Sequence, residues 1–239
     1  MYVAMFFLGI VISCGGPKSV HGSREEVSLN LSRKGLTEIP DYVFGKKSLK
    51  VLKLYNNKLN SIPERIGELE NLEKLYLGRN QLKTLPAAIG KLKKLKLLSV
   101  QYNNLEELPP EIGQLESLEQ FILNRNRLEQ LPDELGNLKR LEVLQLKFNQ
   151  LEHLPETIGQ CTQLRFIYLE RNNLINLPVS MGKLMHLKEI YLADAGALVD
   201  VPEEMCGIRN LELIEIDAAT ALPACMYVLQ ANRLTIREK

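Results

Sequence analysis

The side chains that could carry out catalysis or bind a metal are few and scattered along this chain. The three histidines, His21, His153 and His186, are too far apart in sequence to suggest a shared metal site. Adjacent carboxylates such as Glu106 and Glu107 fall in segments that we expect to be solvated turns. The sequence contains no G-x-S-x-G segment, no C-x-x-C pair and no phosphate-binding loop. We therefore expect no catalytic residue, no metal and no cofactor, and we interpret the protein as a non-enzyme.

Asparagine, a residue that can bridge backbones, recurs with a period of 23 residues. The positions are Asn57, Asn80, Asn103, Asn126, Asn149 and Asn172. Leucines keep the same period from Leu49 to Leu187, and prolines keep it from Pro63 to Pro178. A fixed period of this length is typical of stacked repeats, in which each unit buries its apolar face against its neighbours. An amide both donates and accepts, so stacked asparagines can link the backbones of adjacent coils.

One unit reads L-x-x-L-x-L-x-x-N-x-L-x-x-L-P-x-x-I-G-x-L-x-x. Leu75 and Leu77 are spaced as on one face of a short strand, so the residues between them must point the other way. Pro86 fixes φ where the chain leaves for the outer side. The Ile-Gly-x-Leu segment that follows fits a short helical or 3₁₀ turn, with Gly90 permitting close packing.

This pattern resembles the leucine-rich repeat family in its 23-residue bacterial form, over residues 27–223. The resemblance implies an α/β fold: a solenoid with a curved parallel β-sheet on the concave face and short helical or 3₁₀ turns on the convex side. We expect about nine units, with degenerate units at the ends, where Lys34, Ala195 and Ala219 replace the asparagine. Residues 224–239 are expected to form a C-terminal cap and tail, with residues 233–239 solvated.

Residues 1–13 are uncharged and almost wholly apolar, but too few to span a bilayer, which favours a signal peptide. The segment Val11-Ile12-Ser13-Cys14 resembles the loose spirochaetal lipobox, whose cysteine carries the lipid. Together with the repeats, it makes the chain most similar to the leptospiral leucine-rich repeat lipoproteins. The resemblance implies a protein anchored to the bacterial envelope (outer membrane or periplasm) through Cys14, with residues 14–26 as a tether. A cytosolic protein with an apolar leader and a protein secreted without lipid are the alternatives.

The remaining cysteines occupy positions that indicate a structural role. Cys161 stands where another unit has Leu69, and Cys206 is assigned to the position of Ile66, so both are expected in the core. Cys225 lies beside Cys206 in the next coil. A capping disulfide and two free thiols are both compatible with this placement.

The variable strand positions, which have no duty in the core, are rich in aromatic and arginine residues. The candidate partner-binding residues are Tyr55, Tyr76, Arg79, Tyr102, Arg125, Phe148, Phe166, Tyr168, Arg171 and Tyr191. Such residues carry most of the energy of protein interfaces. Tyr168 and Tyr191 share a column and should touch. From Arg79 to Arg171 another column alternates arginine with aromatic residues, close enough for cation–π contact. That column is either part of a partner site or a ladder that satisfies itself.

The net charge is +1 and charged residues make up 25% of the chain, so nothing indicates nucleic-acid binding. Charge is graded along the variable positions. The basic residues towards the start are Arg33, Lys53, Lys74, Arg79, Arg125 and Lys147. The acidic residues towards the end are Glu170, Glu189, Asp194, Glu215 and Asp217. Such asymmetry can orient a bound partner or permit head-to-tail self-association.

The sequence therefore predicts an exported protein-binding module whose partner, a host protein being one candidate, lies on the concave face. A membrane is expected as the second partner, through the lipid, and nucleic acid is not expected. One alternative is a cytosolic scaffold or signalling adaptor resembling the Ras-suppressor-like repeat proteins. Another is a surface structural protein that assembles with itself.

Overall fold

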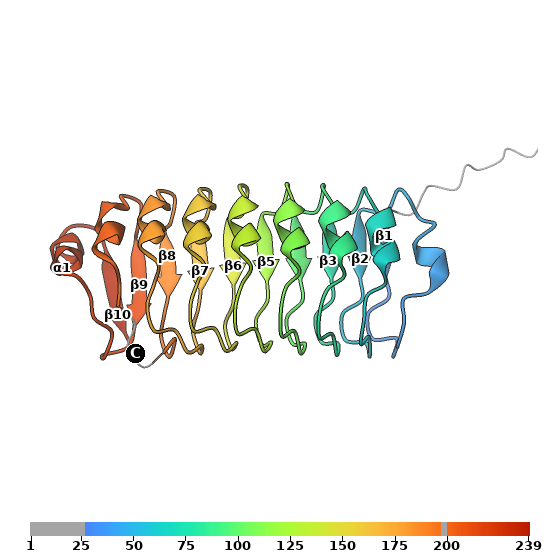
Figure 1. Cartoon of the computed structure of the whole chain (residues 1–239), viewed down its shortest axis with the longest axis horizontal. Helices are drawn as coiled ribbons and strands as arrows, with labels where there is room; N and C mark the ends of the chain where they lie inside the picture. The colour runs from blue at the N-terminus through green and yellow to red at the C-terminus, as the bar shows by residue number, and fades with distance from the viewer. Residues whose placement is uncertain (1–26, 197–199) are drawn as a thin grey trace, which may run out of the picture.

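Each 23-residue unit forms one coil of a solenoid, with a short strand on one side and a 3₁₀ helix on the other (Figure 1). The computed structural model describes residues 27–196 and 200–239. The expected signal peptide, lipobox and tether lie outside the described residues. Within these ranges no helix combines the length and apolar character needed to cross a membrane.

The strands form one parallel sheet in which each strand pairs with the next along the chain. They are β1 (Ser28–Asn30), β2 (Val51–Lys53), β3 (Lys74–Tyr76), β4 (Leu97–Ser99), β5 (Gln120–Ile122), β6 (Val143–Gln145), β7 (Phe166–Tyr168), β8 (Glu189–Tyr191), β9 (Leu213–Ile216) and β10 (Thr235–Glu238). The sheet confirms the predicted α/β solenoid. In register, equivalent residues of successive units face each other, as Leu52 faces Leu75.

The convex side is built from short 3₁₀ helices and one terminal α-helix. They are η1 (Asp41–Val43), η2 (Glu64–Glu68), η3 (Ala87–Lys91), η4 (Pro110–Gln114), η5 (Asp133–Asn137), η6 (Glu156–Gln160), η7 (Val179–Lys183), η8 (Glu203–Gly207) and α1 (Ala224–Gln230). The repeated proline precedes η2 to η8 in extended conformation, as Pro86 does with φ −71°. Between the sheet and these helices lies one apolar core, in which Leu75, Leu77 and Ile89 are fully buried.

The repeated asparagines bridge adjacent coils, as predicted. The Oδ1 atom of Asn126 accepts the backbone N–H of Leu105 at 3.0 Å, one coil back. Its Nδ2 atom donates to the carbonyls of Val100 and Leu123, at 3.1 and 2.8 Å. The same bonds recur at Asn80, Asn103, Asn149 and Asn172. Each buried amide thus satisfies backbone groups that a strand leaves unpaired where the chain turns.

Glycine recurs in the 3₁₀ helices because successive coils approach closely there. A Cβ atom on Gly136 would lie 2.4 Å from the carbonyl oxygen of Thr157 in the next coil. The prediction that Cys206 fills the isoleucine column is wrong. Met205 fills it and is fully buried, because one extra residue shifts the register of that unit. Cys206 instead follows Gly182 in the glycine column, at a coil with no further 3₁₀ helix stacked on it.

The last coil is closed by α1 and by a tenth strand. Cys206 forms a disulfide with Cys225 of α1, with the Cα atoms 6.1 Å apart, which decides between the two states that the sequence left open. Cys161 is buried in the core, as expected. The prediction of a solvated tail over residues 233–239 is wrong, because β10 pairs in parallel with β9. Residues of the tail therefore extend the concave face by one strand.

Candidate binding face

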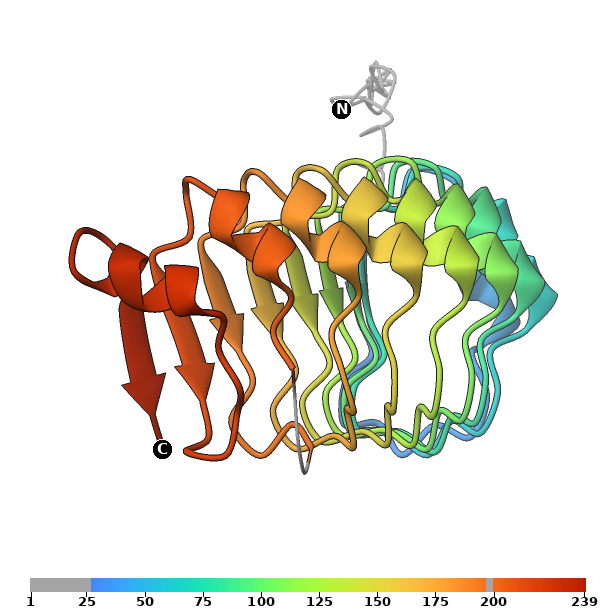
Figure 2. The same ribbon diagram turned by 60° about the vertical axis from the view of Figure 1, so that its left-hand side comes forward.

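The concave face is the side of the sheet that points away from the 3₁₀ helices (Figure 2). Four positions of each coil lie on it: the first and third strand residues, then the second and third residues after the strand. In the coil of β5 these are Gln120, Ile122, Asn124 and Arg125. Since coils stack in register, each position forms a column along the solenoid. We number these columns one to four in chain order.

The fourth column has an unusual backbone. Its residues adopt positive φ, between 55° and 59°, in eight successive coils. Asparagine and glycine tolerate this left-handed conformation best, whereas other residues bear a cost of about 1–2 kcal/mol. Large side chains nevertheless occupy it in the middle of the solenoid: Arg79, Tyr102, Arg125, Phe148 and Arg171. We call these five residues the ring–arginine ladder.

Neighbours in the ladder are in cation–π contact, which confirms the predicted geometry. The guanidinium carbon of Arg79 lies 5.1 Å from the centroid of Tyr102, and that of Arg125 lies 5.2 Å from the same ring. Phe148 is likewise contacted from both sides, at 3.9 Å by Arg125 and at 5.1 Å by Arg171. Each interior guanidinium is thereby held in place by rings.

Carboxylates are unevenly shared among the arginines of the ladder. Arg171 pairs with Asp194 at 3.4 Å, at the acidic end. No carboxylate of residues 27–196 or 200–239 pairs with Arg79 or Arg125. Cation–π contact uses the face of a guanidinium and leaves its N–H donors, which lie in the plane, available to a ligand.

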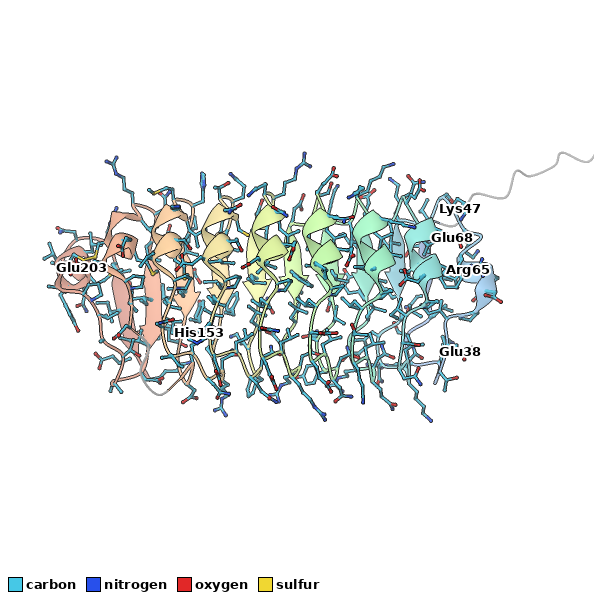
Figure 3. All side chains as sticks on the ribbon, viewed as in Figure 1. Glu38, Lys47, Arg65, Glu68, His153 and Glu203 are labelled. Carbon is cyan, nitrogen blue, oxygen red and sulfur yellow. A yellow bond between two sulfur atoms is a disulfide. The ribbon has the colours of Figure 1, made fainter. Side chains whose placement is uncertain are left out.

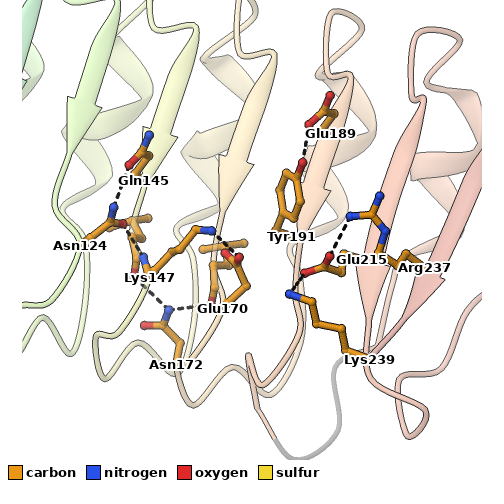
Figure 4. Close-up of polar contacts among 12 residues, drawn as sticks. Asn124, Gln145, Lys147, Glu170, Asn172, Glu189, Tyr191, Glu215, Arg237 and Lys239 are labelled. Atoms are coloured by element: carbon orange, nitrogen blue, oxygen red, sulfur yellow. Dashed lines mark hydrogen bonds and ion pairs between the residues drawn. The ribbon is translucent and has the colours of Figure 1, made fainter.

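The second aromatic group lies further along the sheet, in column two. The rings of Tyr168 and Tyr191 are stacked, with centroids 4.7 Å apart and planes 12° apart, as the shared column predicted. Lys147 Nζ lies 4.6 Å from the centroid of Tyr168 and forms an ion pair with Glu170 (Figure 4). The hydroxyl of Tyr191 donates to Glu189 at 2.6 Å. That hydrogen bond, and then burial, raise the pKa of Tyr191 above its usual value.

A buried carboxylate lies beside this group. The side chain of Glu215 is 2% exposed and pairs with Arg237 at 3.3 Å and with Lys239 at 2.6 Å (Figure 4). Both cations come from the tail that the sequence led us to expect in solvent, so sequence analysis missed them. A signal existed, because Ile236 falls in the core column of the strands. Glu215, thus neutralised, is no longer an exposed charge for head-to-tail self-association.

The other candidate residues are more dispersed. Tyr55 is contacted by Arg79 at 5.9 Å, at the start of the ladder. Tyr76 has Lys53 over its ring at 5.8 Å. Phe166 lies in column one, with Arg165 over it at 5.7 Å. The ten candidate residues therefore form a line of contacts in column four, an aromatic pair in column two, and isolated rings between them.

Residues away from the concave face form local contacts. His153 lies near the edge of the solenoid, with its Nδ1 atom 3.4 Å from Asn176 Oδ1 (Figure 3). On the convex side Arg65 Nε donates to Glu68 at 3.0 Å, and this hydrogen bond lowers the pKa of that carboxyl. Among the described residues no group of three or more His, Cys, Asp or Glu side chains could hold a metal ion.

Comparison with known proteins agrees with this architecture. A family model described as a leucine-rich repeat region matches residues 43–154. A leucine-rich repeat protein of Leptospira interrogans is 30% identical, with a TM-score of 0.75 over 88% of this chain and 55% of that one. No curated protein sequence matches the chain.

Two plant receptors have similar structures and were solved with their ligands. One is the ectodomain of an Arabidopsis thaliana membrane receptor kinase, GASSHO1/SCHENGEN3, in complex with CASPARIAN STRIP INTEGRITY FACTOR 2. It is 28% identical, with a TM-score of 0.71 over 84% of this chain and 26% of that one. The other is a plant peptide hormone receptor in complex with RGF2, 28% identical, with a TM-score of 0.70 over 89% of this chain and 32% of that one.

This chain therefore spans about half or less of the length of these three structures. Its repeat, its parallel sheet and these similarities all agree on the same architecture, which typically serves as a non-enzymatic scaffold for protein binding. The chain belongs to the leucine-rich repeat family.

Proposed function

We propose that the protein is a non-enzymatic binding module that holds a protein partner on its concave face. The observation that carries the proposal is the ring–arginine ladder. Its central residues bear the cost of positive φ where asparagine would bear less, and Arg79 and Arg125 keep donors that no carboxylate of the described chain uses. Arginine and aromatic residues on an exposed surface are those from which interface hot spots are built.

The structural relatives add support of a coarser kind. The two plant receptors were solved with ligands bound, which shows that solenoids of this type accept protein or peptide partners. Fold similarity alone does not carry a partner from one protein to another. The chemistry of this chain's own concave face therefore has to specify what it binds.

We further propose that the protein is exported and held at the bacterial envelope, in the outer membrane or periplasm, by lipid on Cys14. The apolar residues 1–13 and the lipobox-like segment before Cys14 motivate this. The disulfide between Cys206 and Cys225 supports it, because disulfides persist in oxidising compartments and are rare in the cytosol. A cytosolic adaptor would keep both cysteines reduced.

Site-specific photo-crosslinking in the producing cells tests the binding face. A photoreactive phenylalanine analogue at Phe166, on the concave face, should give a protein adduct. The same analogue at Val179, which is 55% exposed on the convex side, is the matched control. Equal adducts from both positions, or none from Phe166, would exclude concave-face binding.

Fatty-acid labelling tests the anchor independently. We expect label on the native protein and none on a Cys14→Ser variant. An unlabelled native protein with Met1 still attached would favour the cytosolic adaptor.

A further inference from the structure

We propose that the ring–arginine ladder binds an acidic peptide segment in the polyproline II conformation, with a carboxylate at every third residue. The inference rests on the proposed function, since it names the partner chemistry of the same face. Three properties of the concave face support it: its charge, the spacing of its arginines, and the rings between them.

The part of the face that contains the ladder is basic throughout. Over residues 51–148, all of which the structure describes, the four columns contain no carboxylate. They contain the cations Lys53, Lys74, Arg79, Arg125 and Lys147. Lys147 is paired with Glu170 from the next coil, and the arginines are held only by rings. A field of one sign favours a ligand of the opposite sign and raises the rate of its association.

The spacing of the arginines selects the conformation of that ligand. Parallel strands lie about 4.8 Å apart, so arginines two coils apart are separated by roughly 10 Å. A polyproline II helix has three residues per turn and rises about 3.1 Å per residue, so every third side chain returns to one face after roughly 9 Å. In an extended β-strand, side chains on one face recur after about 7 or 13 Å instead. An α-helix reaches about 10.5 Å with residues seven apart, and it is therefore the competing occupant.

The aromatic rings favour the polyproline II form over the α-helix. Tyr102 is 40% exposed although it lies between two arginines, and Phe148 is half-buried two coils further on. These two rings have the same spacing as the arginines and alternate with them. Segments rich in proline bind to surfaces lined with aromatic rings, and they lose little entropy because their conformation is already formed. Carboxylates would take the guanidinium donors, while prolines between them would lie on the rings.

Synthetic peptides in a fluorescence anisotropy titration test the proposal. The probe is three repeats of Glu-Pro-Pro, blocked at both ends, at low ionic strength. Its control has the same composition, with the three glutamates consecutive and the six prolines after them. We expect the spaced peptide to bind about tenfold more tightly, a difference of ~1.4 kcal/mol. Equal affinities, or tighter binding of an α-helical peptide with glutamates seven apart, would overturn the proposed ligand.

A matched pair of variants locates the binding. Arg125→Asn removes the central arginine and places at φ 58° a residue that tolerates this conformation, so the fold is retained. Arg140→Asn removes the same charge from an exposed position away from the concave face. The first variant should lose the preference for the spaced peptide and the second should keep it. Similar loss in both would mean that only overall charge matters, which contradicts a specific ladder site.

The two proposals fail separately. If photo-crosslinks form at Phe166 and the spaced peptide shows no preference, the concave face binds a partner of another chemistry. If the peptide binds as expected without crosslinks in cells, the ladder has the proposed specificity and the assignment of the cellular function is wrong.

Discussion

Tyr168 and Tyr191 stack face to face from adjacent coils, with their ring centroids 4.7 Å apart. Because both rings lie on the outer side of the sheet, their stacking adds little to the core and presents one broad aromatic surface. Replacing both with alanine should weaken binding of the partner found by crosslinking by about 2 kcal/mol or more, as expected of hot spots. The check is a titration by calorimetry, with circular dichroism to verify the fold. Unchanged affinity would remove this pair from the binding site.

The ladder gives a prediction about stability. Tyr102→Asn removes ring contacts worth about 0.5–1 kcal/mol each and relieves the cost of a tyrosine at φ 57°. Because the two effects oppose each other, the free energy of unfolding should change by no more than about 1 kcal/mol. Urea unfolding monitored by circular dichroism measures it. A loss of several kcal/mol would show that the ladder exists chiefly to hold the solenoid together.

The asparagine bridges give the opposite expectation. Asn126→Ala leaves one backbone N–H and two carbonyls short of a buried partner, which should cost about 3 kcal/mol. Asn71→Ala is the control, because the Nδ2 atom of Asn71 donates to a backbone carbonyl at the exposed edge. Its loss should cost about 0.5 kcal/mol. Urea unfolding of the two variants compares these costs, and equal costs would contradict the role of the buried ladder.

The buried carboxylate of Glu215 makes the last strand necessary. Replacing both Arg237 and Lys239 with glutamine leaves that charge without its partners, at a cost of about 3 kcal/mol. Adding Glu215→Gln to the pair should restore most of the stability, since an amide has no charge to compensate. Thermal unfolding of the three proteins checks this. If the triple variant is no more stable than the double, the tail stabilises the fold only by pairing with β9.

Tyr191 predicts a dependence on alkaline pH. Its hydrogen bond to Glu189, and then burial, raise its pKa in the folded protein above the value of about 10 for an unfolded chain. The folded state thus holds this proton more tightly, so the stabilisation is fully present below about pH 10 and is lost as the pH rises through the folded pKa. Urea unfolding at about pH 9 and about pH 11 should show a smaller decrease for Tyr191→Phe than for the native protein. Tyr42→Phe, at a ring 55% exposed, is the control and should behave as the native protein does.

Most of the fold could be predicted because the repeat encodes it locally. The spacing of Leu75 and Leu77 indicates a strand, and the period of Asn126 and its equivalents indicates how coils bond to one another. The failures lie where the period breaks. One extra residue moved Met205 and Cys206 by one column, and without the neighbouring coil nothing in the sequence marks the shift.

The candidate site was predictable in part, for the same reason. Columns follow from the period, so the contact of Tyr168 with Tyr191 could be predicted. The positive φ of the ladder, which has no consistent residue type, could not. Nor could the ion pairs of Glu215, because in the segment that supplies them Ile236 alone falls in phase with the core.

The alternation of arginine and ring in column four has a consequence for how such a gene can change. The core repeats every 23 residues, but the ladder repeats only after two coils, which is 46 residues. Loss or duplication of a single coil would preserve the core and bring two guanidinium groups, or two rings, into contact at the junction. Loss or duplication of a pair would preserve both. Selection on the ladder would therefore make the paired coil the heritable unit, and chains descended from this one should differ in length by even numbers of coils.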